Sequence, residues 1–223
     1  MKQLKSFYEE MRRCLRETPL FVIYLDGMGY SMYESAADAG KIPQIASAFQ
    51  VDPVRTVIPP VTHPALATIL TGCLPEEHKI LNRNCHVPAV PTIFKDWKKN
   101  AAYLEGDSVI IRTELPPRLH TKREGLETDE WIFQSVLAEI GKGTYFILAH
   151  FHGIDDAAHL YGPYGEKTLE EIERKDEMTG EIVRRFQGQV LLISDHGLHE
   201  SSESGDHGWN CPEDMTAIWG KRR

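Results

Sequence analysis

Three short runs of apolar residues divide the chain, and each has the length of one β-strand. They are FVIYLD at 21 to 26, TYFILAHF at 144 to 151 and QVLLISD at 189 to 195. A continuous apolar run bounded by polar residues is typical of a strand buried on both faces of a sheet. Helical spacing appears before and between these runs, at 1 to 17 and near 64 to 70, 129 to 140 and 168 to 187. This alternation predicts an α/β fold, a three-layer α/β/α sandwich with a largely parallel central sheet.

The segment from about 82 to 128 interrupts this alternation. It contains many prolines and basic residues, and its strand signals are weak, as in SVIIRT at 108 to 113. We interpret it as an insertion or small cap within a single domain that spans residues 1 to 223.

Charge and composition exclude several classes of protein. The net charge is −8, so the chain has no excess of basic residues with which to neutralise a polymeric nucleic acid. No run approaches the ~20 apolar residues of a membrane span, and the N-terminal residues lack the apolar core of a secretory signal. The four cysteines show no CxxC pairing and are too few for a disulfide scaffold. We therefore expect a cytoplasmic protein that contacts neither a membrane nor a nucleic acid polymer.

Acidic and imidazole side chains follow the predicted strands directly. Asp26 ends the first apolar run, HFHGIDD at 150 to 156 overlaps the end of the second, and Asp195 ends the third. Because the carboxyl ends of parallel strands meet at one edge of a sheet, these side chains should lie close together. Carboxylates bind hard divalent cations, and zinc also accepts neutral imidazole. The sequence therefore predicts a metal site at this edge.

Further histidines occur at spacings that suit metal ligation. Asp155 and His159 are four residues apart, so one helical turn would place both on the same face. Asp195 and His196 stand where a buried strand enters a glycine turn, and His207 is flanked by glycines that allow a close backbone approach. Each pattern alone also fits a surface pair or ordinary turn chemistry. Their occurrence together favours a site.

The segment at 54 to 80 indicates phosphate binding rather than metal binding. Its sequence is VRTVIPPVTHPALATILTGCLPEEHKI. Thr62 precedes Pro64, which suits the first turn of a helix, and Gly72 lies where that helix would end. The free N–H groups and the dipole at a helix N-terminus favour anions, so they would bind a phosphate and stabilise an ionised threonine. The alternative is that Thr62 only caps the helix.

These motifs resemble those of the nucleotide pyrophosphatase and type I phosphodiesterase branch of the alkaline phosphatase superfamily. YLDGMG looks like its first strand with a metal-binding Asp. VTHPALATILTGCLPEEH is similar to its nucleophile segment, in which a Thr or Ser lies nine residues before the Thr of a TG pair. IDDAAHLYGP resembles the DxxxH segment, ISDHG the strand-end DHG, and GDHG the last metal-binding GxHG. The matches keep the family's order and cover most of the chain.

The resemblance implies a site for two divalent cations, with zinc as the first choice and Mn²⁺ or Mg²⁺ as alternatives. The implied ligands are Asp155, His159 and His207 for one cation, and Asp26, Asp195, His196 and Thr62 for the other. It also implies that Thr62 is the catalytic nucleophile. The expected activity is hydrolysis of phosphodiester or phosphoanhydride bonds in small, nucleotide-like substrates through a phosphothreonine intermediate.

The chain also departs from the family pattern. Members usually carry longer insertions and a further C-terminal stretch, so we expect a small or open substrate pocket here. Members commonly bind a phosphoryl oxygen with an Asn that follows the nucleophile segment, and both Asn82 and Asn84 are candidates. The remaining histidines match no ligand position and are expected to be structural or on the surface: His63, His78, His86, His120, His150, His152 and His199.

Three other functions compete with this interpretation. A phosphomonoesterase or phosphomutase of the same superfamily would share the metals. A sulfatase is less favoured, because no CxPxR-like segment surrounds Thr62. The complete set of ligands argues against a degenerate metal-binding or structural module that kept the fold without turnover. The sequence does not indicate the oligomeric state.

Overall fold

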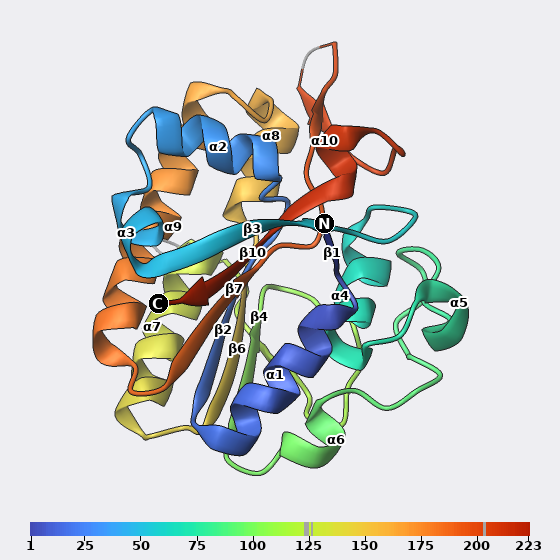
Figure 1. Cartoon of the computed structure of the whole chain (residues 1–223), viewed down its shortest axis with the longest axis vertical. Helices are drawn as coiled ribbons and strands as arrows, with labels where there is room; N and C mark the ends of the chain where they lie inside the picture. Colours follow the sequence, from blue (N-terminus) through green and yellow to red (C-terminus); the bar gives the residue numbers. More distant parts are fainter. Residues whose placement is uncertain (123–124, 126, 203) are drawn as a thin grey trace.

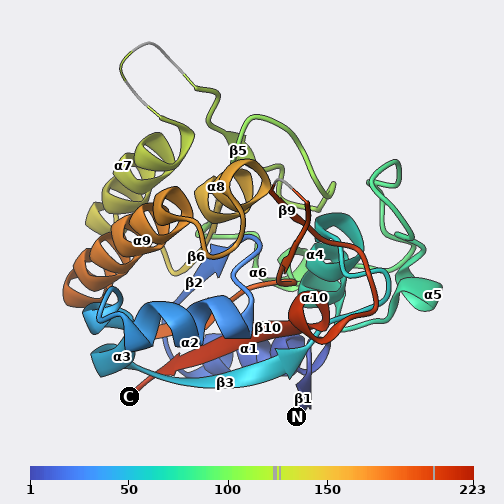
Figure 2. The same ribbon diagram turned by 90° about the horizontal axis from the view of Figure 1, so that it is seen from above.

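The computed structural model describes residues 1–122, 125, 127–202 and 204–223. An eight-stranded sheet lies between two layers of helices (Figures 1 and 2). Its strand order is β1-β3-β10-β7-β2-β6-β4-β5. The strands are β1 (Lys2–Gln3), β2 (Leu20–Leu25), β3 (Phe49–Arg55), β4 (Ala101–Glu105), β5 (Arg118–Leu119), β6 (Phe146–Phe151), β7 (Gln189–Ile193) and β10 (Thr216–Arg222). Within the described ranges, β10 is the strand of this sheet that runs antiparallel to its neighbours.

The helices cover both faces of the sheet. They are α1 (Ser6–Glu17), α2 (Tyr30–Asp38), α3 (Pro43–Ala48), α4 (Thr62–Thr71), α5 (Pro75–His78), α6 (Phe94–Trp97), α7 (Thr128–Gly141), α8 (Gly153–Tyr161), α9 (Glu166–Arg185) and α10 (Pro212–Met215). Figure 2 shows α1, α4 and α6 on one side of the sheet and α2, α3, α7 and α9 on the other. A second, two-stranded sheet pairs β8 (His199–Glu200) with β9 (Gly205–Asp206).

The three predicted strands form the centre of the sheet as β7, β2 and β6. Side chains alternate along β2, so Val22 and Tyr24 pack in the core beneath α1 and α4, whereas Ile23 and Leu25 pack in the core beneath the other helix layer. All six residues of β2 are buried. Burial on both faces explains why the strand reads as one apolar run, and the predicted α/β/α sandwich is confirmed.

The 82 to 128 segment is partly built into the sheet. Its residues 101–105 form β4, which pairs in parallel with β6, and β5 pairs with β4 in turn. The weak strand signal at 108 to 113 lies instead in irregular chain. Helix α6 also lies in this segment, and its Phe94 is buried in the core, so only the loops are left for a cap. Separately, no helix in the described parts of the chain has the length and apolar character needed to cross a membrane.

Candidate active site

The carboxyl ends of the three central strands meet beside the start of α4. Asp26 follows β2, Asp195 and His196 follow β7, and His150 and His152 lie at the end of β6. Asp195 and His196 are fully buried, and Asp26 is 4% exposed. The sheet therefore gathers acids and imidazoles at the predicted edge.

A glycine after β2 allows the neighbouring ligands to approach. Gly27 has a φ of +68°, and a Cβ atom there would lie 2.6 Å from the Oδ1 atom of Asp155. Its backbone N–H also donates to the Oδ1 atom of Asp195 at 3.2 Å. A side chain at this position would be strained and would displace Asp155. The glycine of the YLDGMG motif is therefore needed for steric reasons, whereas its Asp is a candidate metal ligand.

The first group of metal donors consists of Asp26, Asp195 and His196, whose ligand atoms all lie within 4.8 Å of one another. The Nε2 atom of His196 is 3.2 Å from Asp195 Oδ2 and 3.6 Å from Asp26 Oδ1. Both carboxylate oxygens are buried and lack a hydrogen-bond partner among the described residues. Buried carboxylate oxygens without donors are costly, and a cation between them would remove that cost.

The second group surrounds Asp155 on α8. His159 Nε2 lies 3.3 Å from Asp155 Oδ2, and His207 Nε2 lies 4.0 Å from Asp155 Oδ1. This Oδ1 atom is again buried without a partner in the described part of the chain. The closest trio of donors around Asp155 contains His196 and His207 rather than His159. The two groups therefore adjoin at His196, whose ring stacks on that of His207 at 3.9 Å.

The three candidate histidine ligands are held in the same tautomer. Each Nδ1 atom faces a backbone carbonyl oxygen at 3.1 Å: His159 faces Gly205, His196 faces Gly197, and His207 faces Pro60. Because a carbonyl oxygen only accepts, each Nδ1 atom carries a proton and donates it. The Nε2 atoms, which face the carboxylates, are then the atoms available to a cation.

The pKa values of His159 and His207 are shifted in opposite directions. The Asp155 carboxylate raises the pKa of His159 to about 9, so a cation must displace a proton from this ring before it can bind. Burial, together with the neighbouring His196, lowers the pKa of His207. His207 is therefore the neutral imidazole of the pair at pH 7, which is the form that ligates metals.

Thr62 is the first residue of α4, and its Oγ1 atom lies 3.4 Å from the Nε2 atom of His196. Val61 occupies the N-cap position and makes no side-chain cap hydrogen bond. The helix ends as expected at Gly72, which has a φ of +71°. The alternative role of Thr62 as the N-cap residue is thus not supported, and its hydroxyl instead faces the metal donors.

A small cavity of about 240 Å³ opens in front of Thr62. Its lining combines candidate ligands with residues from the 54 to 86 region: Val61, Thr62, His63, Arg83, Asp155, His159 and His207. Asn82 and Asn84 are exposed and do not line it, and Asn82 Oδ1 accepts the backbone N–H of Asn84 at 2.9 Å. The turn that this bond closes presents Arg83, which the sequence motifs did not single out.

A buried carboxylate holds the two histidines at the end of β6 against Asp26. His150 Nε2 lies 3.1 Å from Asp26 Oδ2, and its Nδ1 atom lies 2.8 Å from Glu105 Oε1. His152 repeats the arrangement, with Nδ1 3.4 Å from Asp26 Oδ2 and Nε2 2.7 Å from Glu105 Oε1. Glu105 also accepts the hydroxyl of Tyr103 at 2.7 Å. Burial opposes ionisation of Glu105, but His150 and His152 outweigh it and lower the pKa.

Glu105 thus orients Asp26 through two imidazoles, which makes it a positioning residue that no sequence motif marked. His150 and His152 could also donate to a cation together with Asp26, since their ligand atoms lie within 4.8 Å of one another. The motifs gave these two histidines no ligand position, but both contact a candidate ligand directly. With Oδ2 of Asp26 held by the two rings, Oδ1 is left to face His196.

Glu105→Gln is expected to weaken cation binding by about 10- to 100-fold, because an amide is neutral and has one acceptor oxygen where Glu105 uses two for His150, His152 and Tyr103, so Asp26 would lose its fixed orientation. Zinc affinity measured by competition with a chromogenic chelator checks this. Glu139→Gln is the matched control, since Glu139 is a buried glutamate that bonds Arg118, Lys142 and Thr144 instead. Equal affinities for the two variants would show that Glu105 does not act on the site.

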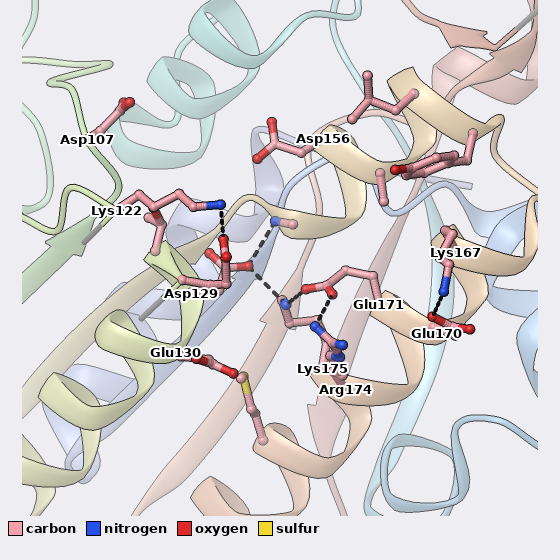
Figure 3. Close-up of a pocket in the computed structure, with 17 residues that line it drawn as sticks. Asp107, Lys122, Asp129, Glu130, Asp156, Lys167, Glu170, Glu171, Arg174 and Lys175 are labelled. Carbon is pink, nitrogen blue, oxygen red and sulfur yellow. Dashed lines mark hydrogen bonds and ion pairs between the residues drawn. The ribbon is translucent and has the colours of Figure 1, made fainter. Parts of the chain in front are cut away.

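An ion pair fixes the start of α8, which carries Asp155. The carboxylate of Asp129 accepts the backbone N–H groups of His152 at 3.0 Å and Gly153 at 2.8 Å, and Lys175 Nζ lies 3.0 Å from Asp129 Oδ2. Figure 3 shows Asp129 of α7 and Lys175 of α9 pointing toward each other in a groove of about 610 Å³. The groove lies along a different face of α8 from the cavity at Thr62. Helices α7 and α9 therefore position the second group of donors.

The sequence profile of the type I phosphodiesterase / nucleotide pyrophosphatase family matches residues 20–115 and 90–215. The chain belongs to this family. The family resemblance that the motifs indicated is therefore confirmed, and the matched residues include both groups of candidate metal donors and the start of α4.

Individual relatives are distant and much longer. The catalytic subunit of human GPI ethanolamine phosphate transferase 3 is 27% identical over 92 residues, which cover 40% of this chain and 8% of the relative. Human ectonucleotide pyrophosphatase/phosphodiesterase family member 1 is 22% identical over 183 residues, 67% of this chain and 20% of the relative. This chain thus spans a fifth or less of these curated relatives.

A solved structure supports the fold. The phosphonoacetate hydrolase from Sinorhizobium meliloti 1021, determined in complex with phosphonoformate, superposes with a TM-score of 0.63 at 19% sequence identity. The match covers 85% of this chain and 59% of that hydrolase. It shows the same central, mostly parallel sheet flanked by helices.

Proposed function

We propose that the protein is a metal-dependent phosphoesterase that cleaves phosphodiester or phosphoanhydride bonds of small, nucleotide-like substrates. The observation that carries this proposal is the position of the Thr62 hydroxyl, at a helix N-terminus and 3.4 Å from His196 in the first group of donors. Membership of the type I phosphodiesterase / nucleotide pyrophosphatase family supports the same reaction class. Thr62 is the proposed nucleophile.

The donor set fits two divalent cations. Asp26, Asp195, His196 and Thr62 would hold one, and Asp155, His159 and His207 would hold the other. Three buried carboxylate oxygens without partners among the described residues support this assignment, and so do the Nε2 atoms of His196 and His207, which face two of these oxygens. The Nε2 atom of His159 faces the other oxygen of Asp155. The mixture of imidazole and carboxylate donors favours zinc over Mn²⁺ or Mg²⁺. When bound, the cations would neutralise charge on the phosphoryl oxygens and on the Thr62 oxygen.

The chain's own groups would perform the substitution at phosphorus. The Oγ1 atom of Thr62 loses its proton to solvent and attacks phosphorus, the bond to the leaving oxygen breaks with uptake of a proton from solvent, and a phosphothreonine forms. Water then attacks the same phosphorus and loses a proton, and the bond to Thr62 breaks as its oxygen takes up a proton to restore the hydroxyl. The free N–H groups at the start of α4 would face the phosphoryl group in both steps, and the helix dipole would favour its negative charge.

Arg83 is the residue best placed to bind the anionic substrate. It lines the cavity in front of Thr62 and brings a guanidinium group to a lining whose other ionisable side chains are one carboxylate and three imidazoles. Guanidinium groups bind phosphoryl oxygens with two parallel hydrogen bonds. Asn82 and Asn84, proposed from the family pattern for the same task, lie on either side of it in the exposed turn.

The proposal is tested by comparing hydrolysis of bis(p-nitrophenyl) phosphate with that of p-nitrophenyl phosphate, with zinc and after chelation. We expect zinc-dependent turnover with kcat/KM higher for the diester. A preference for the monoester would favour the phosphomonoesterase or phosphomutase alternative. Turnover of neither substrate by zinc-loaded protein would favour the metal-binding module without catalysis.

A further inference from the structure

A separate group of nitrogen, sulfur and oxygen donors lies at the base of the segment that carries His207. It consists of His199 in β8, Cys211 immediately before α10, and Asp214 within α10. Their ligand atoms all lie within 4.8 Å of one another, and His199 Nδ1 is 2.8 Å from Asp214 Oδ1. None of the three belongs to the ligand set proposed for the active site.

The Asp214 carboxylate is buried without a lysine or arginine partner among the ion pairs of the described residues. It is 0% exposed, and its oxygens contact the His199 ring and the backbone N–H of Trp209, the latter at 2.8 Å. A buried carboxylate charge is costly unless a cation or several donors compensate it. Cys211 is half-buried, so a cation could reach the group from solvent.

The surrounding segment has few other means of holding its shape. Between Leu198 and Met215, the described residues contribute no buried apolar side chain. The hairpin of β8 and β9 has two residues in each strand. Nevertheless this segment must hold His207 beside Asp155 and against the carbonyl oxygen of Pro60. Its geometry therefore depends on polar contacts at its base, where a metal ion would close the loop.

We propose that His199, Cys211 and Asp214 bind a structural divalent cation of zinc-like softness, separate from the cations of the active site. The thiolate ligand selects zinc, cobalt or cadmium over Mg²⁺ and Mn²⁺. Burial raises the pKa of the Cys211 thiol, so binding displaces its proton to solvent. Water would supply a fourth ligand. The proposal does not rest on the role of Thr62, and its failure would leave the proposed phosphoesterase activity untouched.

The test is to replace zinc in the whole chain with Co²⁺ and to record the near-ultraviolet absorption that arises from charge transfer between a thiolate and cobalt. Wild-type protein should show this band, and Cys211→Ser should abolish it and bind one fewer metal ion per chain. Cys85→Ser is the matched control, because Cys85 is another half-buried thiol that lies outside the donor group. It should keep both the band and the metal content.

X-ray absorption at the zinc edge of wild-type protein gives a second measurement that does not depend on a variant. A zinc–sulfur distance of about 2.3 Å is expected. Absence of sulfur from the zinc spectrum, or a cobalt–thiolate band that survives in Cys211→Ser, would overturn the proposal. His199 and Asp214 would then form only a hydrogen-bonded brace.

Discussion

Replacing Thr62 with alanine is expected to lower kcat/KM by about a thousandfold or more, which corresponds to roughly 4 kcal/mol of transition-state stabilisation. The reason is that the variant has no oxygen to attack phosphorus, although the Asp and His donors stay in place. Zinc content should be largely retained. Thr62→Ser should keep partial activity, because a hydroxyl remains and only the methyl group that restricts its rotamer is lost. Steady-state kinetics on zinc-loaded proteins checks both variants.

Thr71→Ala is the matched control for this prediction. Thr71 lies at the other end of α4, and its hydroxyl donates to the carbonyl oxygen of Ala67 at 2.7 Å. This variant should lose about 1 kcal/mol of stability and keep its turnover. Thr62→Ala should show the reverse, because Val61 and not Thr62 is the N-cap residue. Near-normal turnover by a folded, metal-loaded Thr62→Ala protein would exclude Thr62 as the nucleophile.

Asp195→Asn is expected to have opposite effects on the metal-free and the metal-loaded protein. Burial and the nearby Asp26 raise the pKa of Asp195, which shows that its ionised form is disfavoured without a cation. A neutral amide removes this repulsion and should stabilise the metal-free protein. The same change removes an anionic ligand, so turnover should fall by orders of magnitude. The part of the zinc stabilisation that comes from this cation, about 4 kcal/mol at a thousand times its Kd, should largely disappear.

Thermal unfolding with and without zinc measures both effects on stability. Asp176→Asn provides the control. Asp176 is also buried, but it accepts the backbone N–H groups of Gln44 and Ile45 at 3.0 and 2.7 Å. Its replacement should destabilise the protein whether or not zinc is present, because charge-assisted hydrogen bonds are lost. If Asp195→Asn behaves in the same way, Asp195 is a structural residue and not a metal ligand.

The central strands could be predicted because burial on both faces leaves a simple signal. β2, β6 and β7 read as continuous apolar runs. β10 does not read as an apolar run, because it ends in Gly220, Lys221 and Arg222. Its antiparallel position between β3 and β7 is determined by the pairing of strands in the sheet and not by local sequence. β4 was hidden because five residues within a segment rich in prolines and charges do not show a period.

Some residues of the site could be predicted from local sequence, and others are placed only by the tertiary structure. Asp26, Asp195 and His196 could be predicted because they directly follow strands, and a parallel sheet brings strand ends together. Glu105 could not, since only the pairing of β4 with β6 places it beside His150. Arg83 depends in the same way on the turn that presents it, which no spacing rule describes.

The configuration at phosphorus tests most directly the central claim that Thr62 forms a covalent intermediate. A chiral phosphorothioate diester is hydrolysed in isotopically labelled water, and the configuration of the product is determined. Attack by Thr62 followed by attack of water comprises two in-line displacements, each of which inverts phosphorus. Net retention is therefore the predicted result. Net inversion would mean that water attacks the substrate in a single step, and it would contradict the role assigned to Thr62.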